Sequence, residues 1–466
     1  MPVSPDGMEE LRVRRAVKPG RRMSLRKLAA YVGASLGALV LVVAVLILVF
    51  GDAILNRYVK EKAERAFAGA NPGSVLRIGK LDYSVGANRL VAQSVTLSAA
   101  NTTLKVGPTS LTGVRWARLL WGKAALADVI AKARLDATNL DVEFSRARYR
   151  IRCARLRASI PGSELIAEGT ELRPLVGDKT FFAGSGYRTT RYFVVAPECR
   201  VLGLAYGELL QGKSYRARSV LFSQPSFDAL VNREKPRKPF VKSPLMVHEA
   251  LASIRQPLQV GSLTITNGHL KYGERFAAGA DPAEMTIAAV NLSVEGIGNR
   301  GDANAAVQVR GQGRLMSAGT LKVLMSIPIT SPHFSLHYSG SLGAMDLACL
   351  SAFLDISEHT RIKSGRAQEA AFEIDVAAGR ARGHVRGIYK DLVIAILDKK
   401  TGTEKGFDNR FASFLANLLK IRNSNALNSS GSRKEGKVEY TRKPEDTFLQ
   451  LVWFALRTGV VDIISH

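Results

Sequence analysis

The feature that most constrains this chain is a run of 23 residues, Leu28–Phe50, that contains no charged side chain. At 1.5 Å per residue a helix of this length extends roughly 34 Å, enough to cross a hydrocarbon core of about 30 Å. A cleavable signal peptide is the alternative, but its apolar region is usually shorter and ends in a small-residue cleavage site. We therefore expect residues 28–50 to be an uncleaved transmembrane anchor.

The charges on the two sides of this run predict its orientation. The preceding segment, residues 1–27, is strongly basic, whereas the segment after Phe50 has mixed charge. Positive residues favour the cytoplasmic side of a membrane. We expect a cytoplasmic N-terminus and, in a bacterial envelope, a single-pass inner-membrane protein with most of its chain in the periplasm.

The net charge of the whole chain is +26. Nucleic acid is the usual partner of so basic a protein, but a domain outside the cytoplasm rarely meets it, so we expect no nucleic-acid partner. Anionic lipid headgroups or surface polysaccharide fit the expected location better. A third interpretation is that the charge only keeps the protein soluble.

From residue 74 to about residue 403 the dominant hydrophobic period is two. Apolar residues alternate in short runs such as Leu263/Ile265, Leu292/Val294 and Phe372/Ile374/Val376, and turn signals separate the runs. This pattern predicts a mainly β protein with a predominantly antiparallel sheet that is apolar on one face. Residues 392–397 are continuously apolar and predict a strand that is buried on both faces.

Breaks in composition divide the chain into six segments. A proline-rich basic stretch interrupts the strand pattern and precedes a short predicted helix, and apolar residues at helical spacing predict helices near the C-terminus. The final predicted helix starts at Phe448 and ends near Gly459. The expected segments are a basic tail (1–27), the anchor (28–50), a first β region (51–235), a linker with a short helix (236–257), a second β region (258–405) and a helical tail (406–466).

The sequence contains no convincing catalytic set. The glycine string Gly296–Gly301 is followed by an alternating strand, although a dinucleotide site requires a helix there. His333 and His337 lie on a predicted strand about 13 Å apart, too far for one metal ion. We expect a protein that is not an enzyme and has no cofactor or metal.

Three cysteines leave two alternatives open. An oxidising compartment permits a disulfide between Cys153 and Cys199, with Cys349 free. Two buried thiols are the other alternative.

Several segments carry a family resemblance. Arg77–Tyr83 with Leu90–Leu97 looks like an opening hairpin, Pro257–Tyr272 looks like the strand pair of a second repeat region, and Gly383–Lys400 with Phe448–Gly459 looks like a closing strand and tail helix. With the basic tail and the anchor, these segments resemble the bacterial AsmA-like family, which includes the TamB and YhdP proteins.

This resemblance implies a folded-over β-sheet whose apolar face forms a groove, and a role in moving phospholipid toward the outer membrane. The candidate groove residues are Val95, Leu97, Leu263, Ile265, Leu292, Val294, Leu321, Val323, Met325, Phe334 and Leu336. An equally reasonable interpretation of these residues is the closed core of a sandwich. Basic residues along the rim could attract headgroups, and the candidates are Arg310, Arg314 and Lys322.

The leading hypothesis is therefore an envelope protein whose partners are phospholipid and the inner membrane, with a role in phospholipid transfer or outer-membrane lipid homeostasis. The length of the groove leaves open a further partner among other envelope proteins. The alternative hypothesis is an assembly or scaffold factor for outer-membrane proteins that uses exposed sheet edges to pair with client strands.

Overall fold

A computed structural model of the chain describes residues 60–84, 86–115, 126–239, 243–301, 305–329, 331, 333–397, 421–427, 429 and 431–465. The expected basic tail and anchor, and the first part of the expected helical tail, lie outside these residues. No helix in the described ranges is both long enough and apolar enough to cross a membrane.

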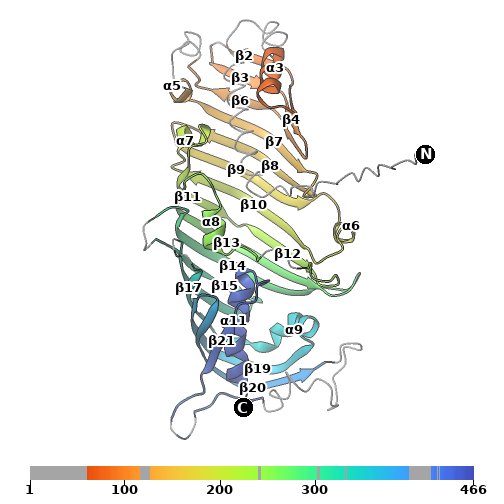
Figure 1. The fold of residues 1–466 in the computed structure, drawn as a ribbon, viewed down its shortest axis with the longest axis vertical. Helices are drawn as coiled ribbons and strands as arrows, with labels where there is room; N and C mark the ends of the chain where they lie inside the picture. Colours follow the sequence, from red (N-terminus) through yellow and green to blue (C-terminus); the bar gives the residue numbers. More distant parts are fainter. Residues whose placement is uncertain are drawn as a thin grey trace, which may run out of the picture.

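The protein is mainly β, as predicted, with 55% of the described residues in strands and 15% in helices. Within the described ranges, the strands form one 21-stranded sheet that extends along the long axis of the molecule (Figure 1). Its first strands are β1 (Ser74–Ile78), β2 (Leu81–Ser84), β3 (Arg89–Ala92), β4 (Val95–Ala99), β5 (Thr102–Val106), β6 (Thr109–Thr112) and β7 (Arg134–Phe144). Its middle strands are β8 (Tyr149–Ser159), β9 (Glu164–Pro174), β10 (Thr190–Leu202), β11 (Tyr215–Ser223), β12 (Ser226–Asn232), β13 (Leu258–Arg275) and β14 (Ala283–Gly298).

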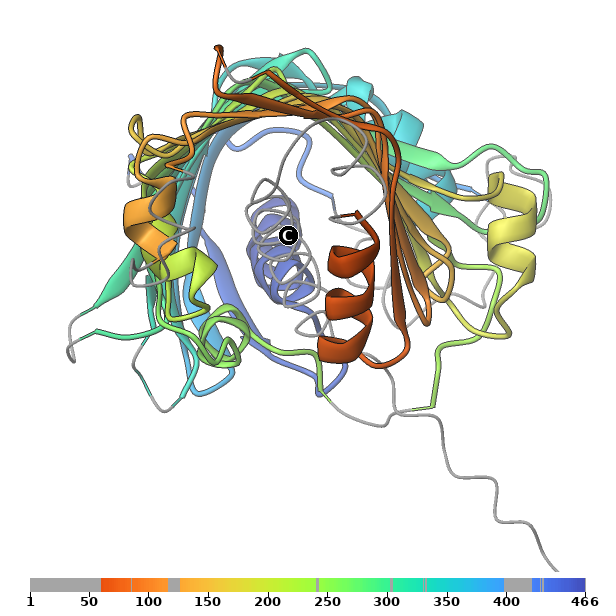
Figure 2. The same ribbon diagram turned by 90° about the horizontal axis from the view of Figure 1, so that it is seen from above.

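The last strands are β15 (Ala306–Leu315), β16 (Gly319–Pro328), β17 (Ser335–Leu342), β18 (Met345–Asp346), β19 (Thr360–Ala377), β20 (Arg380–Ile396) and β21 (Gly436–Thr441). The helices are α3 (Lys60–Ala70), α5 (Leu126–Ile130), α6 (Asp178–Ala183), α7 (Tyr206–Leu210), α8 (Val247–Ala252), the 3-10 helix η2 (Leu347–Leu350), α9 (Ser351–Ser357) and α11 (Phe448–Ile464). Figure 2 shows the strands curving round an interior that contains α3 and α11.

The sheet bends because several strands change direction near their middle. Residues with positive φ lie at these points in several of the strands, including Asn139 of β7 (54°), Gly169 of β9 (60°) and Asn267 of β13 (51°). Glycine is required at position 169, because a Cβ there would lie 2.9 Å from the Cβ of Ala154. We call this line of bends the crease.

The crease also shifts the side-chain alternation by one residue. On β8 the arginines are Arg150, Arg152, Arg155 and Arg157, so their spacing is two, then three, then two. Arg155 bonds Asp136 and Arg152 bonds Asp141 on the neighbouring strand β7. The charged residues of β8 therefore lie on one face, the outer face, on both sides of the crease, and Ile151 and Leu156 lie on the other face.

Short strands meet long strands at the crease. β11 and β12 both pair antiparallel with β10, on opposite sides of the crease, and both pair parallel with β13. The remaining pairings are antiparallel, so the expected antiparallel sheet has two parallel exceptions. The linker at residues 236–257 does not divide the sheet, because it connects β12 to β13, which are hydrogen-bonded neighbours.

Two helices pack on the inner face at opposite ends of the sheet. Phe67 of α3 lies in a buried cluster with residues of β1 to β7, and Leu451 and Ala455 of α11 lie in another with residues of β15 to β21. The helix α11 continues past the predicted end at Gly459 to Ile464.

Two further predictions are corrected. The described part of the C-terminal region is not entirely helical, because β21 pairs with β20. The strand at residues 392–397 is not buried on both faces, because Val393 is 42% exposed.

Candidate functional site

An uninterrupted row of apolar residues runs across the inner face of the sheet. Each member is the direct register partner of the next, so all members share one face. The row consists of Tyr83, Leu90, Leu111, Leu135, Ala158, Leu165, Val201, Val220, Leu263, Val294, Val309, Met325, Tyr338, Ile374, Gly383 and Val438. We call it the first row.

A second row runs on the other side of the crease. It consists of Leu76, Leu97, Leu104, Val142, Ile151, Leu172, Val194, Phe227, Leu270, Ile287, Leu315 and Gly319. Leu97 of this row and Leu90 of the first row belong to the same buried cluster under α3. Both rows therefore face the interior.

Burial changes along the rows. Leu90 is 1% exposed at one end of the first row, and Tyr338 and Ile374 are fully buried near the other end. Between these ends the apolar side chains from β8 to β14 are mostly half-buried, and Phe227 is 38% exposed. The two ends of the first row are thus closed by α3 and α11, while the middle of the inner face retains accessible apolar surface.

The candidate groove residues divide between these two environments. Val95, Leu97, Phe334 and Leu336 are core residues, with exposures of 9% or less. The other candidates are half-buried on the inner face: Leu263, Ile265, Leu292, Val294, Leu321, Val323 and Met325. A hollow of about 680 Å³ between β13 and β17 is lined mainly by outward-facing residues, among them Arg310, Lys322 and Leu324, so it does not belong to the inner face.

The basic candidates do not share this face. In the register of β15 and β16, the partner of Arg310 is Leu324, the partner of Lys322 is Gln312 and the partner of Arg314 is Thr320. These pairs of residues alternate along the strands with the pairs that face inward. Arg310, Arg314 and Lys322 therefore project from the outer face, and Arg310 forms an ion pair with Glu295 at 3.1 Å. They do not lie on a rim beside the apolar side chains.

The three cysteines are free thiols. Cys153 lies on β8 and Cys199 on β10, and β9 lies between them. Residues on strands two apart are separated by at least about 9.5 Å, whereas a disulfide requires Cα atoms within about 7 Å. The structure therefore contains two separate thiols rather than the disulfide, and burial raises the pKa of Cys199 above its usual value.

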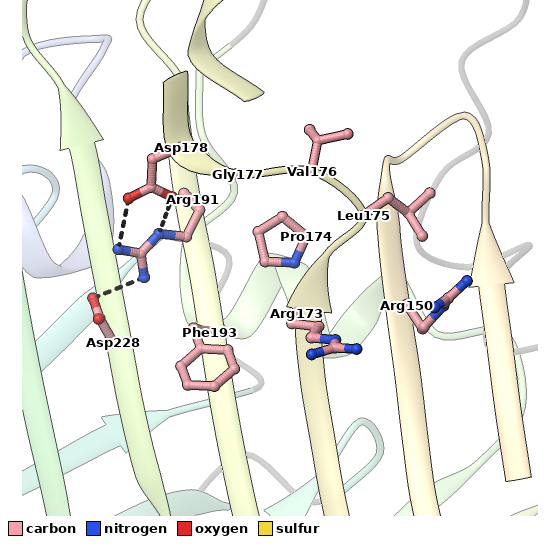
Figure 3. Close-up of a pocket in the computed structure, with 10 residues that line it drawn as sticks. All are labelled: Arg150, Arg173, Pro174, Leu175, Val176, Gly177, Asp178, Arg191, Phe193 and Asp228. Carbon is pink, nitrogen blue, oxygen red and sulfur yellow. Dashed lines mark hydrogen bonds and ion pairs between the residues drawn. The ribbon is translucent and has the colours of Figure 1, made fainter. Parts of the chain in front are cut away.

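A second hollow, of about 470 Å³, lies at the strand ends beside the loop from β9 to α6 (Figure 3). Arg191 bonds Asp178 at 3.2 Å and Asp228 at 3.0 Å across it. Arg150 bonds Glu143 at 2.9 Å, so most of the cationic groups here already have carboxylate partners.

An inward cluster at the ends of β12 and β13 was not predicted from the sequence. Arg233 bonds Glu274, and the Tyr272 hydroxyl donates to the same carboxylate at 2.5 Å. The only sequence signal is period two itself, which continues from Phe227 through Ala229 and Val231 to Arg233.

Within the described ranges, no group of three or more histidine, cysteine, aspartate or glutamate side chains is placed to hold a metal ion. No protein-family model matches the chain, and no curated protein matches it.

Proposed function

We propose that the inner face of the sheet accommodates phospholipid acyl chains and that the protein transfers phospholipid within a cell envelope. The observation that carries this proposal is the continuity of the two apolar rows, which cross the sheet without a charged member and remain half-buried between the α3 and α11 ends. The resemblance to the AsmA-like family supports the same function.

The energetic reason is the cost of exposing an acyl chain to water. At about 0.8 kcal/mol per CH₂, a chain of about sixteen carbons costs roughly 13 kcal/mol. A continuous apolar strip removes most of this cost at every point along its length. Two facing rows on a bent sheet would form a groove in which the chains are sheltered.

The proposed location follows from the anchor at residues 28–50 and the basic tail before it. The N-terminus would lie in the cytoplasm, and the sheet would start in the periplasm next to the inner membrane. Lipid would then enter near the membrane that supplies it.

Site-specific photocrosslinking of the full chain in cells with phosphate-labelled lipids tests this proposal. We would place p-benzoylphenylalanine at Leu292, which faces inward, and at its outward neighbour Ser293 as the matched control. Labelled phospholipid attached at position 292 but not at position 293 is the expected result. Equal labelling, or no labelling at position 292, would refute the proposal. Attachment of protein strands instead would favour an assembly factor.

A further inference from the structure

On β10, β12 and β13 the inner face changes its chemistry from the crease to the strand ends. Nearest the crease, Val194, Phe227 and Leu270 are consecutive register partners in the second row. Two residues farther along the strands, Ala229 of β12 is the register partner of both Tyr192 and Tyr272. Tyr192 is 42% exposed, and its ring centroid lies 5.9 Å from that of Phe227. This part of the face is apolar and aromatic.

The next positions toward the strand ends are polar and then cationic. Thr190 and Glu274 are both register partners of Val231. Arg233 follows two residues later and bonds Glu274, which confirms that both side chains lie on the same face. Arg188 precedes β10, and its backbone N–H donates to the Pro236 carbonyl at 2.9 Å, which holds it beside the segment after β12.

Cationic groups outnumber their partners at this place. The Glu274 carboxylate is occupied by Arg233 and by a tyrosine hydroxyl, and Arg237 forms an ion pair with Glu445 at 3.3 Å. Arg188 forms no ion pair with any described residue, and its Nε donates only to the Lys235 carbonyl at 2.9 Å. Its charge therefore remains available.

The neighbouring groups make this charge costly in the absence of an anion. Burial lowers the pKa of Arg188, Arg233 and Arg237 lower it further, and Glu274 acts in the opposite direction. The Nε of Arg233 is also buried without a hydrogen-bond partner. A phosphate oxygen would offset both effects, because guanidinium groups bind phosphate through paired charge-assisted hydrogen bonds.

We propose that Arg188 and Arg233 hold the phosphate of a phospholipid headgroup at this strand end, while the acyl chains lie over Phe227 and the second row. This inference rests on the proposed function and names its substrate class.

Six residues separate Arg233 from Phe227, about 20 Å along the strand. One leaflet contributes about 15 Å to a hydrocarbon core of about 30 Å. The distance along the strand from the cationic end to the apolar part thus matches the dimensions of a phospholipid.

The test uses the purified full chain with p-benzoylphenylalanine in place of Phe227 and two lipids with identical labelled tails. Phosphatidylglycerol carries the phosphate, and diacylglycerol does not. The chain with native Arg188 should capture phosphatidylglycerol at least about tenfold better, since hydrogen bonds to charged groups are worth about 1.5–3 kcal/mol. Arg188→Gln should remove this preference, and Arg188→Lys should restore part of it. Arg200→Gln, on the outer face of the same strand, is the matched control and should change nothing.

The outcomes separate the two proposals. Equal capture of both lipids by the chain with native Arg188, or an Arg188→Gln variant that keeps the preference, would overturn the headgroup site while leaving the apolar face intact. Calorimetry that shows inorganic phosphate binding through Arg188, combined with equal capture of both lipids, would identify free phosphate as the ligand and would also overturn it. Failure to capture either lipid at positions 227 and 292 would instead refute the proposed function.

Discussion

Arg233 and Glu274 form an ion pair on the inner face, with side-chain exposures of only 19% and 8%. The Tyr272 hydroxyl donates to the same carboxylate. The pair lies at the ends of β12 and β13, where the apolar surface of the sheet gives way to charge. It therefore both stabilises the parallel strand pair and fixes the position of a guanidinium group at the edge of the inner face.

Replacing Glu274 with glutamine should destabilise the protein strongly. Removing one partner of a buried pair leaves the other charge uncompensated and typically costs about 3–5 kcal/mol. We expect a clear fall in the midpoint of thermal or chemical unfolding. The matched control is Glu61→Gln in α3, whose ion pair with Arg65 is exposed, and it should have little effect. Equal shifts for the two variants would contradict the burial argument.

A charge in the open middle of the inner face should affect lipid rather than folding. Leu292→Glu should abolish the recovery of bound phospholipid and leave the circular dichroism spectrum unchanged, because its side chain is only half-buried. The outward variant Ser293→Glu should retain the lipid.

Leu336→Glu, in contrast to Leu292→Glu, should affect folding. Leu336 is 2% exposed in the cluster under α11, so a carboxylate there should unfold the C-terminal part of the sheet. If Leu292→Glu unfolds the protein as severely, the middle of the sheet is a closed core.

The close approach of α11 to the sheet depends on Gly459. A Cβ at this position would lie 2.6 Å from methyl groups of both Val385 and Val438. Gly459→Ala should therefore displace the helix and cost about 1–3 kcal/mol in unfolding experiments. Gly69→Ala in α3, where nothing lies within 4 Å of the added carbon, should be neutral or slightly stabilising. A neutral Gly459→Ala variant would show that the helix is loosely packed.

Acidification should weaken the packing around α8. His248 is 9% exposed, and its ring centroid lies 5.5 Å from that of Phe334. Burial lowers the pKa of His248, Arg442 lowers it further, and Glu249 partly opposes them. The unfolded chain therefore binds a proton at a higher pH, near 6.5, than the folded chain does.

The contribution of His248 to stability should consequently be constant above about pH 6.5 and fall as the pH falls below that value. The measurement is the unfolding midpoint as a function of pH. His248→Gln should reduce the slope, and the exposed control His269→Gln should leave it unchanged. An unaltered slope in His248→Gln would assign the pH dependence to other groups.

Part of the site was visible in the sequence. Period two identified the β class and apolar inward residues of β4, β13, β14 and β16, because alternation within a strand is a local property. None of the inward residues from β5 to β12 was among the candidates. The same local rule could have excluded Lys322 from the apolar face, since it is adjacent to Val323. By contrast, Arg152 and Arg155 are three residues apart and yet lie on the same face. This is evident only from their partners on β7, which show that the side-chain alternation shifts by one residue at Ala154.

The sequence by itself determined the mainly β class, the apolar character of one face and the uncharged run at residues 28–50, because these depend on composition and on spacing along the chain. Only the tertiary structure decided which apolar residues are core and which remain accessible. Leu97 is buried in the cluster that includes α3 and Leu336 in the cluster that includes α11, whereas Leu263 belongs to neither cluster. The position of Arg188 beside Arg233 likewise depends on contacts between residues far apart in sequence, which no local pattern encodes.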